Sequence, residues 1–295
     1  MSGKNAQTYQ LIRFEGDRNK PLCIFIHGMG MNASMWADPE NARILGGTYP
    51  LSILLHKREM ETSYHDLKDH GFPLLAWSQK RPAGAAMAAV AELQDIVAEY
   101  SSMSLLGIVL IGHSRGGLIA RKFLQHSNAM ILGIITIGTP HKGSSMAKWA
   151  EYISPLTTLV RKLMDVRDND VKTAAHRIVA FLEGEGIKEM LPGSDFITGL
   201  STEKGPQIPA VSVGGTDPEF VRFGNASLPK LLSMIIPEHS IPDELREGRG
   251  DGLVSISSAV YPGGEHRNYH AHHAGLLFDP KVRAYILDVM TSLVA

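Results

Sequence analysis

The chain has 295 residues, of which 44% are hydrophobic and 20% are charged, and 29 basic against 30 acidic side chains give a formal net charge of −1. This composition is typical of a globular protein and excludes a disordered or fibrous chain. The near-neutral charge argues against a nucleic-acid-binding protein, because phosphate neutralisation requires a basic surplus. The apolar runs are far shorter than the roughly 20 residues of a bilayer-spanning helix, so we expect no stable membrane insertion.

The N-terminal segment lacks the apolar central region of a secretory signal, which predicts a cytoplasmic protein. Cys23 is the single cysteine, so no intramolecular disulfide can form. It lies in an apolar run, and we therefore expect a buried small hydrophobic residue rather than a nucleophile. The sequence does not indicate the oligomeric state.

Short apolar runs bounded by glycine or proline alternate with helix-like segments. Such runs suit strands that are buried on both faces of a parallel sheet. The predicted strands, the first of them an amphipathic edge strand, are Tyr9–Phe14, Leu22–Ile26, Phe72–Trp77, Ile108–Ile111, Ile134–Ile137 and Ala210–Val213. The predicted helices are Ala83–Tyr100, Leu118–Gln125 and the C-terminal Pro280–Val294. This alternation predicts an α/β fold with a mostly parallel central sheet flanked by helices.

Residues 143–202 interrupt the alternation. Apolar residues recur every three or four positions from Met146 to Met164, which predicts an amphipathic helix, and Pro155 predicts a kink or a second helix start within it. Val171–Leu182 is a further predicted helix. We interpret 143–202 as a helical insertion in one domain spanning 1–295, with a separate helical domain as the alternative. The insertion is either a mobile cap or a static part of the core packing.

The sequence GHSRGG at residues 112–117 lies between the fourth predicted strand and the second predicted helix. The G-x-S-x-G pattern is common by chance, but between a buried strand and a helix it describes a nucleophile elbow. The turn is tight, so the residues that flank it must be small, as Gly112 and Gly116 are. Ser114 is therefore the candidate nucleophile. The alternative is a glycine-rich turn in which the serine only caps the helix.

A serine hydroxyl is a poor nucleophile unless a base accepts its proton and an acid holds that base in one tautomer. Asp251 lies in a glycine-flanked segment after the last predicted strand, and His270, His272 and His273 follow near the C-terminus. A nucleophile elbow is usually followed along the chain by an acid and then a histidine. Ser114, Asp251 and the C-terminal histidines occur in this order.

The sequence HGMG at residues 27–30 ends the second predicted strand in a glycine-containing turn. Acyl transfer generates a tetrahedral oxyanion that needs donors already pointing at it. Backbone N–H groups of this turn and of the residue after the nucleophile can supply them. Met29 and Arg115 are the candidates, through their backbones, and we expect His27 to be structural.

Several motifs in one chain order resemble those of the α/β-hydrolase superfamily, within it the lipase and esterase branch. The motifs are FIHGMG at 25–30, GHSRGG at 112–117, GTPHKGS at 138–144, MLPGSDF at 190–196, DGLV at 251–254 and HAGLL at 273–277. The third is similar to the loop that leads into the cap of lipases. Together the matches extend from about residue 21 to the C-terminal helix.

The resemblance also selects among the candidates. The base of the family usually precedes a small residue and a Leu-Leu-like pair, which favours His273 over the other two histidines. Asp251 has the D-G-x-V surroundings of the family acid, whereas Asp217 and Asp243 lack them, and Asp217 before a proline is typical of a turn.

The resemblance implies a serine hydrolase that cleaves carboxylic esters through an acyl-enzyme. Ser114, His273 and Asp251 would form its triad, and the N–H groups of Met29 and Arg115 its oxyanion hole. No cofactor is implied, and the substrate would be a small-molecule acyl ester, lipid esters included. Thioesterase, lactonase and acyltransferase activities share this chemistry and remain alternatives. A fold that binds ligands without catalysis is the alternative from another class.

A metal site is the last candidate. His56, His65, Asp66, Asp69 and His70 fall within 15 residues, and imidazole and carboxylate groups can bind zinc. Some bacterial lipases, which the chain resembles, carry a structural zinc near this region. No fixed ligand spacing is matched, so the sequence favours no metal.

Overall fold

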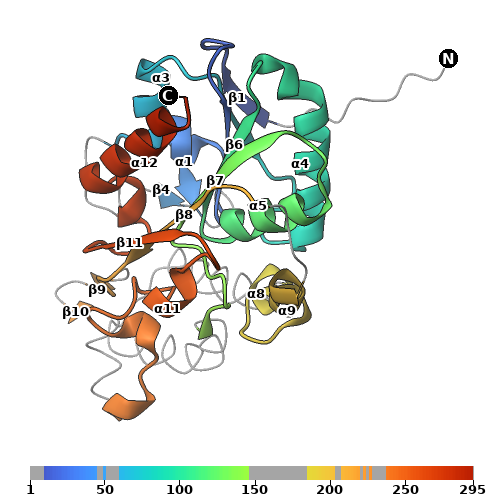
Figure 1. Cartoon of the computed structure of the whole chain (residues 1–295). Helices are drawn as coiled ribbons and strands as arrows, with labels where there is room; N and C mark the ends of the chain where they lie inside the picture. The colour runs from blue at the N-terminus through green and yellow to red at the C-terminus, as the bar shows by residue number, and fades with distance from the viewer. Residues whose placement is uncertain are drawn as a thin grey trace.

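The computed structural model describes residues 10–44, 49–50, 60–145, 185–202, 207–219, 222–223, 226–227 and 237–294 (Figure 1). A seven-stranded sheet runs through its centre in the order β1-β5-β2-β6-β7-β8-β11. These strands are β1 (Gln10–Phe14), β2 (Leu22–Ile26), β5 (Leu74–Ser78), β6 (Ile108–His113), β7 (Ile131–Ile137), β8 (Ala210–Gly215) and β11 (Glu265–Tyr269). β1 is antiparallel to β5, and every other pairing in this sheet is parallel.

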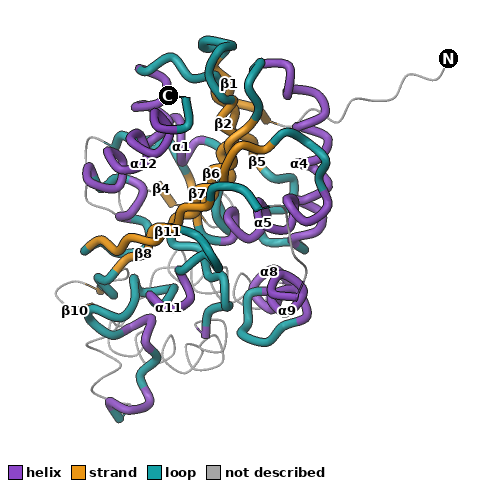
Figure 2. The backbone as a smooth tube through the Cα atoms, viewed as in Figure 1, coloured by secondary structure: helices purple, strands orange, loops and turns teal. Residues whose placement is uncertain are grey.

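Helices cover both faces of the sheet, which forms a middle layer in Figure 2. α4 (Ala86–Tyr100) and α5 (Arg115–His126) pack on one face. α1 (Ser34–Ala37), α3 (Ser63–Asp69) and α12 (Pro280–Ser292) pack on the other. The predicted α/β architecture is confirmed.

The side chains of a strand point alternately to the two faces of the sheet. In β2 both sets of side chains enter a core, which is why its sequence is apolar throughout. Leu22, Ile24 and Ile26 join the core beneath α4 and α5. Cys23 and Phe25 join the core beneath α1, α3 and α12. Because β2 is buried on both faces, apolar side chains suit all five of its positions. Cys23 is fully buried, and burial raises the pKa of its thiol, so it is the small hydrophobic residue that was expected.

The remaining elements lie at the edges of this core. The helices are α8 (Glu185–Glu189), α9 (Asp195–Thr202) and α11 (Ile256–Ala259), with short 3-10 helices at Ser101–Met103, Glu238–Ser240, Asp243–Leu245 and Gly275–Leu277. Two small ribbons pair β3 (Arg43–Ile44) with β4 (Tyr49–Pro50) and β9 (Arg222–Phe223) with β10 (Ala226–Ser227). α9 packs on α5 where Ile197 and Leu200 contact Leu118. Among the described helices, none combines the length and apolar character that a bilayer crossing demands.

Of the predicted insertion, residues 143–145 and 185–202 are described. The helices predicted from Met146 to Met164 and over Val171–Leu182 lie outside the described residues, and the role of the insertion as a cap stays a prediction. Its two described ends meet, because the Ser144 N–H donates to the Met190 carbonyl at 2.8 Å.

Parallel strands place their carboxyl ends at the same edge of a sheet. The segments that follow β2, β6, β7, β8 and β11 therefore all leave the sheet at that edge. In open α/β sheets this edge is where ligands usually bind.

Candidate active site

Ser114 sits in a strained turn between β6 and α5. Its φ of 53° and ψ of −127° make it the one non-glycine residue with positive φ in the described part of the chain. Such a conformation costs of order 1–3 kcal/mol and persists only where the surroundings enforce it. The surroundings here are tight, since a Cβ on Gly116 would lie 2.2 Å from the Ile26 carbonyl oxygen and one on Gly112 2.5 Å from the Gly117 nitrogen.

The Ser114 hydroxyl does not cap the helix it precedes. Ser114 occupies the N-cap position of α5, yet its side chain accepts no capping hydrogen bond. The backbone is fixed instead, because Ser114 N–H donates to the Ile137 carbonyl at 2.8 Å. Ser114 as a whole is half-buried. The sequence alternative of a serine that merely caps the helix is therefore not what the geometry shows.

His273 and Asp251 form a buried pair. His273 Nδ1 lies 2.9 Å from Asp251 Oδ2, and the side chains are 3% and 1% exposed. The other carboxylate oxygen, Oδ1, accepts the N–H groups of Leu253 at 3.0 Å and Val254 at 2.7 Å. The His273 N–H donates to the Asp251 carbonyl at 2.8 Å. The carboxylate is thus fixed from one side and receives the imidazole on the other.

The segments around Ser114 contact this pair. The ring of His113 lies 4.8 Å from the His273 ring, centroid to centroid, and His113 Nε2 is 3.2 Å from the His273 carbonyl oxygen. Gly138 directly follows Ile137, whose carbonyl accepts the Ser114 N–H. A Cβ on Gly138 would lie 3.1 Å from the His273 ring and 3.3 Å from Asp251 Oδ2. The structure therefore brings nucleophile, imidazole and carboxylate candidates to one edge of the sheet.

Two residues of this arrangement were not assigned a role from the sequence. His113, which directly precedes the candidate nucleophile, contacts the candidate base His273. Gly215 ends β8 where a Cβ would lie 2.6 Å from the Cβ of Asp251. The Gly-Gly pair that ends an otherwise apolar strand was the available signal for a close approach.

The competing residues have other partners. His272 Nδ1 accepts the Gly275 N–H at 3.2 Å at the start of a 3-10 helix. Asp217 accepts the Glu219 N–H at 2.8 Å, as in the predicted turn. Asp243 is half exposed and pairs with Arg246 and Arg249. His270 is highly exposed, and its Nδ1 lies 3.7 Å from Glu247.

The turn at residues 27–30 lies against the nucleophile elbow. A Cβ on Gly28 would lie 3.2 Å from the Cβ of Ser114. Gly30 N–H donates to the Pro82 carbonyl at 3.1 Å. Within the described part of the chain, the N–H groups of Met29 and Arg115 donate to no protein acceptor. Two unused backbone donors on adjoining segments fit an oxyanion hole.

His27 is a structural residue of that turn. Its Nε2 accepts the Gln79 N–H at 3.0 Å and its Nδ1 donates to the Gly28 carbonyl at 2.8 Å, so it is neutral with the proton on Nδ1. Burial lowers the pKa of His27 to about 4, and the nearby Arg115 cation acts in the same direction. Burial also lowers the pKa of His113 and of His141 well below the ordinary value.

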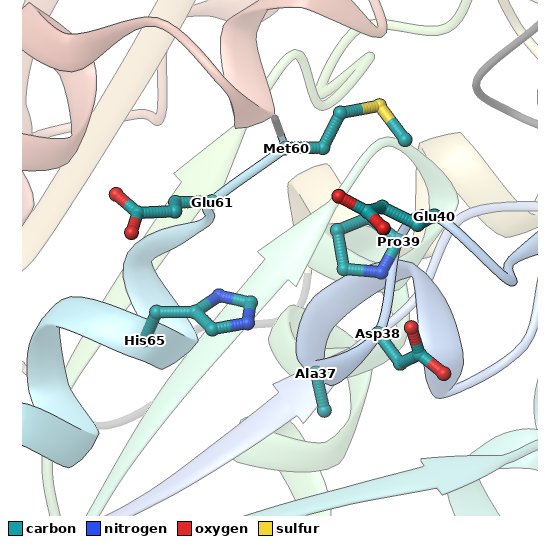
Figure 3. Close-up of a pocket in the computed structure, with 7 residues that line it drawn as sticks. All are labelled: Ala37, Asp38, Pro39, Glu40, Met60, Glu61 and His65. Carbon is teal, nitrogen blue, oxygen red and sulfur yellow. The ribbon is translucent and has the colours of Figure 1, made fainter. Parts of the chain in front are cut away.

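A cavity of about 270 Å³ lies beside α1 and the start of α3 (Figure 3). It is lined by Ala37, Asp38, Pro39, Glu40, Met60, Glu61 and His65. Figure 3 shows the His65 ring directed inward and the Glu61 carboxylate turned away. That carboxylate is 2.8 Å from Arg283. No group of three or more His, Cys, Asp or Glu side chains suited to a metal occurs among the described residues.

The residues considered for zinc are used in other ways. Asp66 pairs with Arg283, and His65 Nδ1 accepts the Thr62 N–H at 3.1 Å in a capping box of α3. His70 Nδ1 lies 2.8 Å from the Asp66 carbonyl oxygen. His56 lies outside the described residues.

Sequence comparison identifies a family. The pattern of the domain of unknown function DUF7379 matches residues 82–283, more than half of the chain. The chain belongs to the DUF7379 family. The matched span of this DUF7379 member includes Ser114, Asp251 and His273, whereas the turn at residues 27–30 precedes it.

Short segments resemble lipases. A triacylglycerol lipase from Pseudarthrobacter phenanthrenivorans is 29% identical to the DUF7379 chain over 92 residues, covering 29% of this chain and 28% of that protein. One from Burkholderia plantarii is 29% identical over 92 residues, covering 29% of this chain and 25% of that protein. The match thus spans about a quarter of the length of each relative.

Solved structures show the fold. The mature form of Bacillus licheniformis lipase BlEst2 has a TM-score of 0.54 at 16% identity, covering 99% of this chain and 100% of that chain. The putative non-heme bromoperoxidase BpoC of Mycobacterium tuberculosis has a TM-score of 0.56 at 13% identity, covering 98% and 97%. The DUF7379 chain has the α/β-hydrolase fold. Since these two neighbours carry names of different reactions, the fold alone does not assign the chemistry.

Proposed function

We propose that this DUF7379 protein is a serine hydrolase that cleaves carboxylic esters through an acyl-enzyme intermediate. Ser114 is the nucleophile, His273 the general base and acid, and Asp251 the residue that orients the imidazole. The backbone N–H groups of Met29 and Arg115 receive the oxyanion. The substrate is a small-molecule acyl ester, and no cofactor takes part in the reaction.

The observation that carries this proposal is the buried His273–Asp251 pair beside the strained serine. A carboxylate that accepts the Nδ1 proton at 2.9 Å holds the imidazole with Nε2 unprotonated. A strained φ at a serine that caps nothing has no structural purpose of its own. Both features are what acyl transfer from a serine requires.

The reaction follows from these roles. Ser114 Oγ attacks the ester carbonyl carbon while His273 Nε2 takes the hydroxyl proton. The tetrahedral oxyanion lies against the two N–H groups, and Asp251 stabilises the imidazolium. The C–O bond then breaks, and His273 returns the proton to the departing alcohol. Water, deprotonated by His273, cleaves the acyl-enzyme and releases the acid.

The relatives support the ester class. The triacylglycerol lipases are named for an ester substrate, although the match covers about a quarter of each. A monoacylglycerol lipase of Paleococcus ferrophilus has the same fold, with a TM-score of 0.50. We therefore take carboxylic esters ahead of thioesters, lactones and acyl transfer to alcohols.

A panel of p-nitrophenyl esters of increasing acyl length, with a thioester and a lactone alongside, tests the proposal on the purified protein. We expect ester turnover that Ser114→Ala lowers by at least about 10⁴-fold, because the acyl-enzyme cannot form. The folded state should be retained, as judged by circular dichroism. A variant that hydrolyses esters at the wild-type rate would remove Ser114 from the proposal.

A serine-directed fluorophosphonate separates catalysis from binding without turnover. Mass spectrometry should find the adduct on Ser114 of the wild type and none on Ser114→Ala. Ligand binding with neither turnover nor adduct would instead identify a binding protein on this fold. Turnover confined to the thioester or the lactone would keep the triad and replace the substrate class.

A further inference from the structure

The side chain of Arg115 is buried at 1% exposure, although the residue begins a helix next to the site. Its guanidinium donates to three oxygens of one segment, residues 79–84. The acceptors are the Pro82 carbonyl at 3.0 Å, the Gly84 carbonyl at 2.5 Å and Gln79 Oε1 at 3.4 Å. Burial lowers the pKa of Arg115, while the carboxylates of Glu189 and Glu92 oppose this. The two terminal nitrogens make these bonds, whereas Nε is buried without a hydrogen-bond partner in the described part of the chain.

The segment at residues 79–84 in turn holds the turn that carries Met29. The Pro82 carbonyl accepts from Gly30 N–H at 3.1 Å as well as from Arg115. Gln79 Nε2 donates to the His27 carbonyl at 3.1 Å, and Gln79 N–H donates to His27 Nε2. Both ends of the turn at 27–30 are therefore bonded to groups that Arg115 contacts.

Two carboxylates hold the chain within and just after this segment. Glu92 Oε2 accepts the Lys80 N–H at 3.2 Å, and Glu189 Oε2 accepts the Ala86 N–H at 2.8 Å. The chain is thus anchored both inside the part that meets the turn and just beyond it. Among the side chains that anchor the segment, only that of Arg115 belongs to a residue whose own backbone N–H is a proposed oxyanion donor.

We propose that the Arg115 side chain is the positioning residue of the oxyanion hole: it fixes, through residues 79–84, the turn that carries the Met29 donor, while its own backbone supplies the second donor. This rests on the proposed function. The guanidinium and the backbone N–H of one residue therefore both affect the spacing between the two donors, and losing the guanidinium shifts one donor relative to the other. A misplacement of about 1 Å at a reacting centre costs about 10²-fold in rate.

Arg121 offers a matched control on the same helix. It is also buried, at 8% exposure, and donates to backbone carbonyls, those of Leu200 at 2.7 Å and His141 at 3.4 Å. These acceptors lie in segments that carry no oxyanion donor. Replacing it removes a buried guanidinium from α5 without touching residues 79–84.

The experiment compares Arg115→Met, Arg115→Lys and Arg121→Met on the best ester of the panel. For Arg115→Met we expect kcat to fall by about 10²-fold with KM within threefold, because the donors act on the oxyanion and not on the bound ester. The affinity for a trifluoromethyl ketone, which forms a tetrahedral adduct with the serine, should fall by a similar factor. Arg115→Lys should restore part of kcat. Arg121→Met should keep kcat within twofold of wild type, even if it lowers the melting temperature as much as Arg115→Met does.

Equal kcat losses in Arg115→Met and Arg121→Met would overturn the proposal, as would a loss confined to KM. If Arg115→Met does not fold, Gln79→Met takes its place, and a kcat within twofold of wild type in both Gln79→Met and Arg115→Lys would overturn it equally. Failure of the proposed function looks different, because the wild type would then lack ester turnover and the Ser114 adduct.

Discussion

The histidines of two histidine–carboxylate pairs lie three residues apart in one C-terminal loop, and the two pairs differ in distance and in burial. His273 and Asp251 are 2.9 Å apart with side chains 3% and 1% exposed. His270 and Glu247 are 3.7 Å apart with side chains 74% and 68% exposed. The sequence offers both histidines as bases, and only their surroundings separate them.

The difference shows what burial adds to a pair of side chains. In water, an imidazole and a carboxylate remain free to change rotamer and to exchange partners. Salt also screens the attraction between them. In the buried pair, the Leu253 and Val254 N–H groups hold one carboxylate oxygen and the other faces the ring. The contact then fixes a tautomer as well as a distance.

Asp251→Asn should have the largest effect, a fall in kcat of about 10³- to 10⁴-fold. The Leu253 and Val254 N–H groups would claim the amide oxygen, which turns the NH2 group toward His273 Nδ1. That nitrogen must then accept, so the proton moves to Nε2 and the base cannot receive a proton from Ser114. Steady-state kinetics on the best ester measures this.

Glu247→Gln is the matched control, since it makes the same chemical change in the exposed pair. Its kcat should remain within twofold of wild type. A similar loss in both variants would mean that the exposed pair takes part in the reaction and that burial does not distinguish the two.

The sheet could be predicted from the sequence wherever strands are buried on both faces. Leu22–Ile26 was predicted with its observed bounds because all five side chains enter a core. The edge strand Glu265–Tyr269 was missed, since its residues EHRNY are largely exposed and give no apolar run. The start of α5 was predicted at Leu118 rather than Arg115 because two glycines of low helix propensity occupy its first turn.

The candidate site could be predicted in its residue types and not in its contacts. The strained serine was expected, because its strand–turn–helix context and small neighbours are local features. The support from His113 and Gly138 depends on loops that meet across more than 100 residues of chain. The support from Gly215 depends on its approach to Asp251, which lies in a different loop. The positioning contacts of Arg115 were equally invisible, since its side chain bonds to backbone carbonyls that any sequence supplies.

The buried histidines should make the fold sensitive to acid. The pKa of His27 is lowered to about 4 from its ordinary 6.5, so below pH 6.5 the unfolded chain binds a proton that the native state refuses. Stability therefore falls as pH falls from 6.5 toward 4. His27 alone contributes a loss of about 2 kcal/mol at pH 5. His113 and His141 act in the same direction.

Urea unfolding at several pH values between 7.5 and 5 gives this loss directly. His27→Gln should reduce the slope of unfolding free energy against pH by up to one proton. A slope that His27→Gln leaves unchanged would contradict the assignment of the acid sensitivity to this buried neutral ring.

The smallest expected effect is the coupling within the exposed pair. A double-mutant cycle with His270→Ala and Glu247→Ala should give about 0.5 kcal/mol or less in unfolding free energy at pH 5.5, and less again in 0.5 M salt. Ordering two solvated side chains offsets most of their attraction at 3.7 Å. A coupling above about 1 kcal/mol that survives salt would show that His270 and Glu247 are held as firmly as the buried pair. Exposure would then be a poor guide to which histidine of this loop is the base.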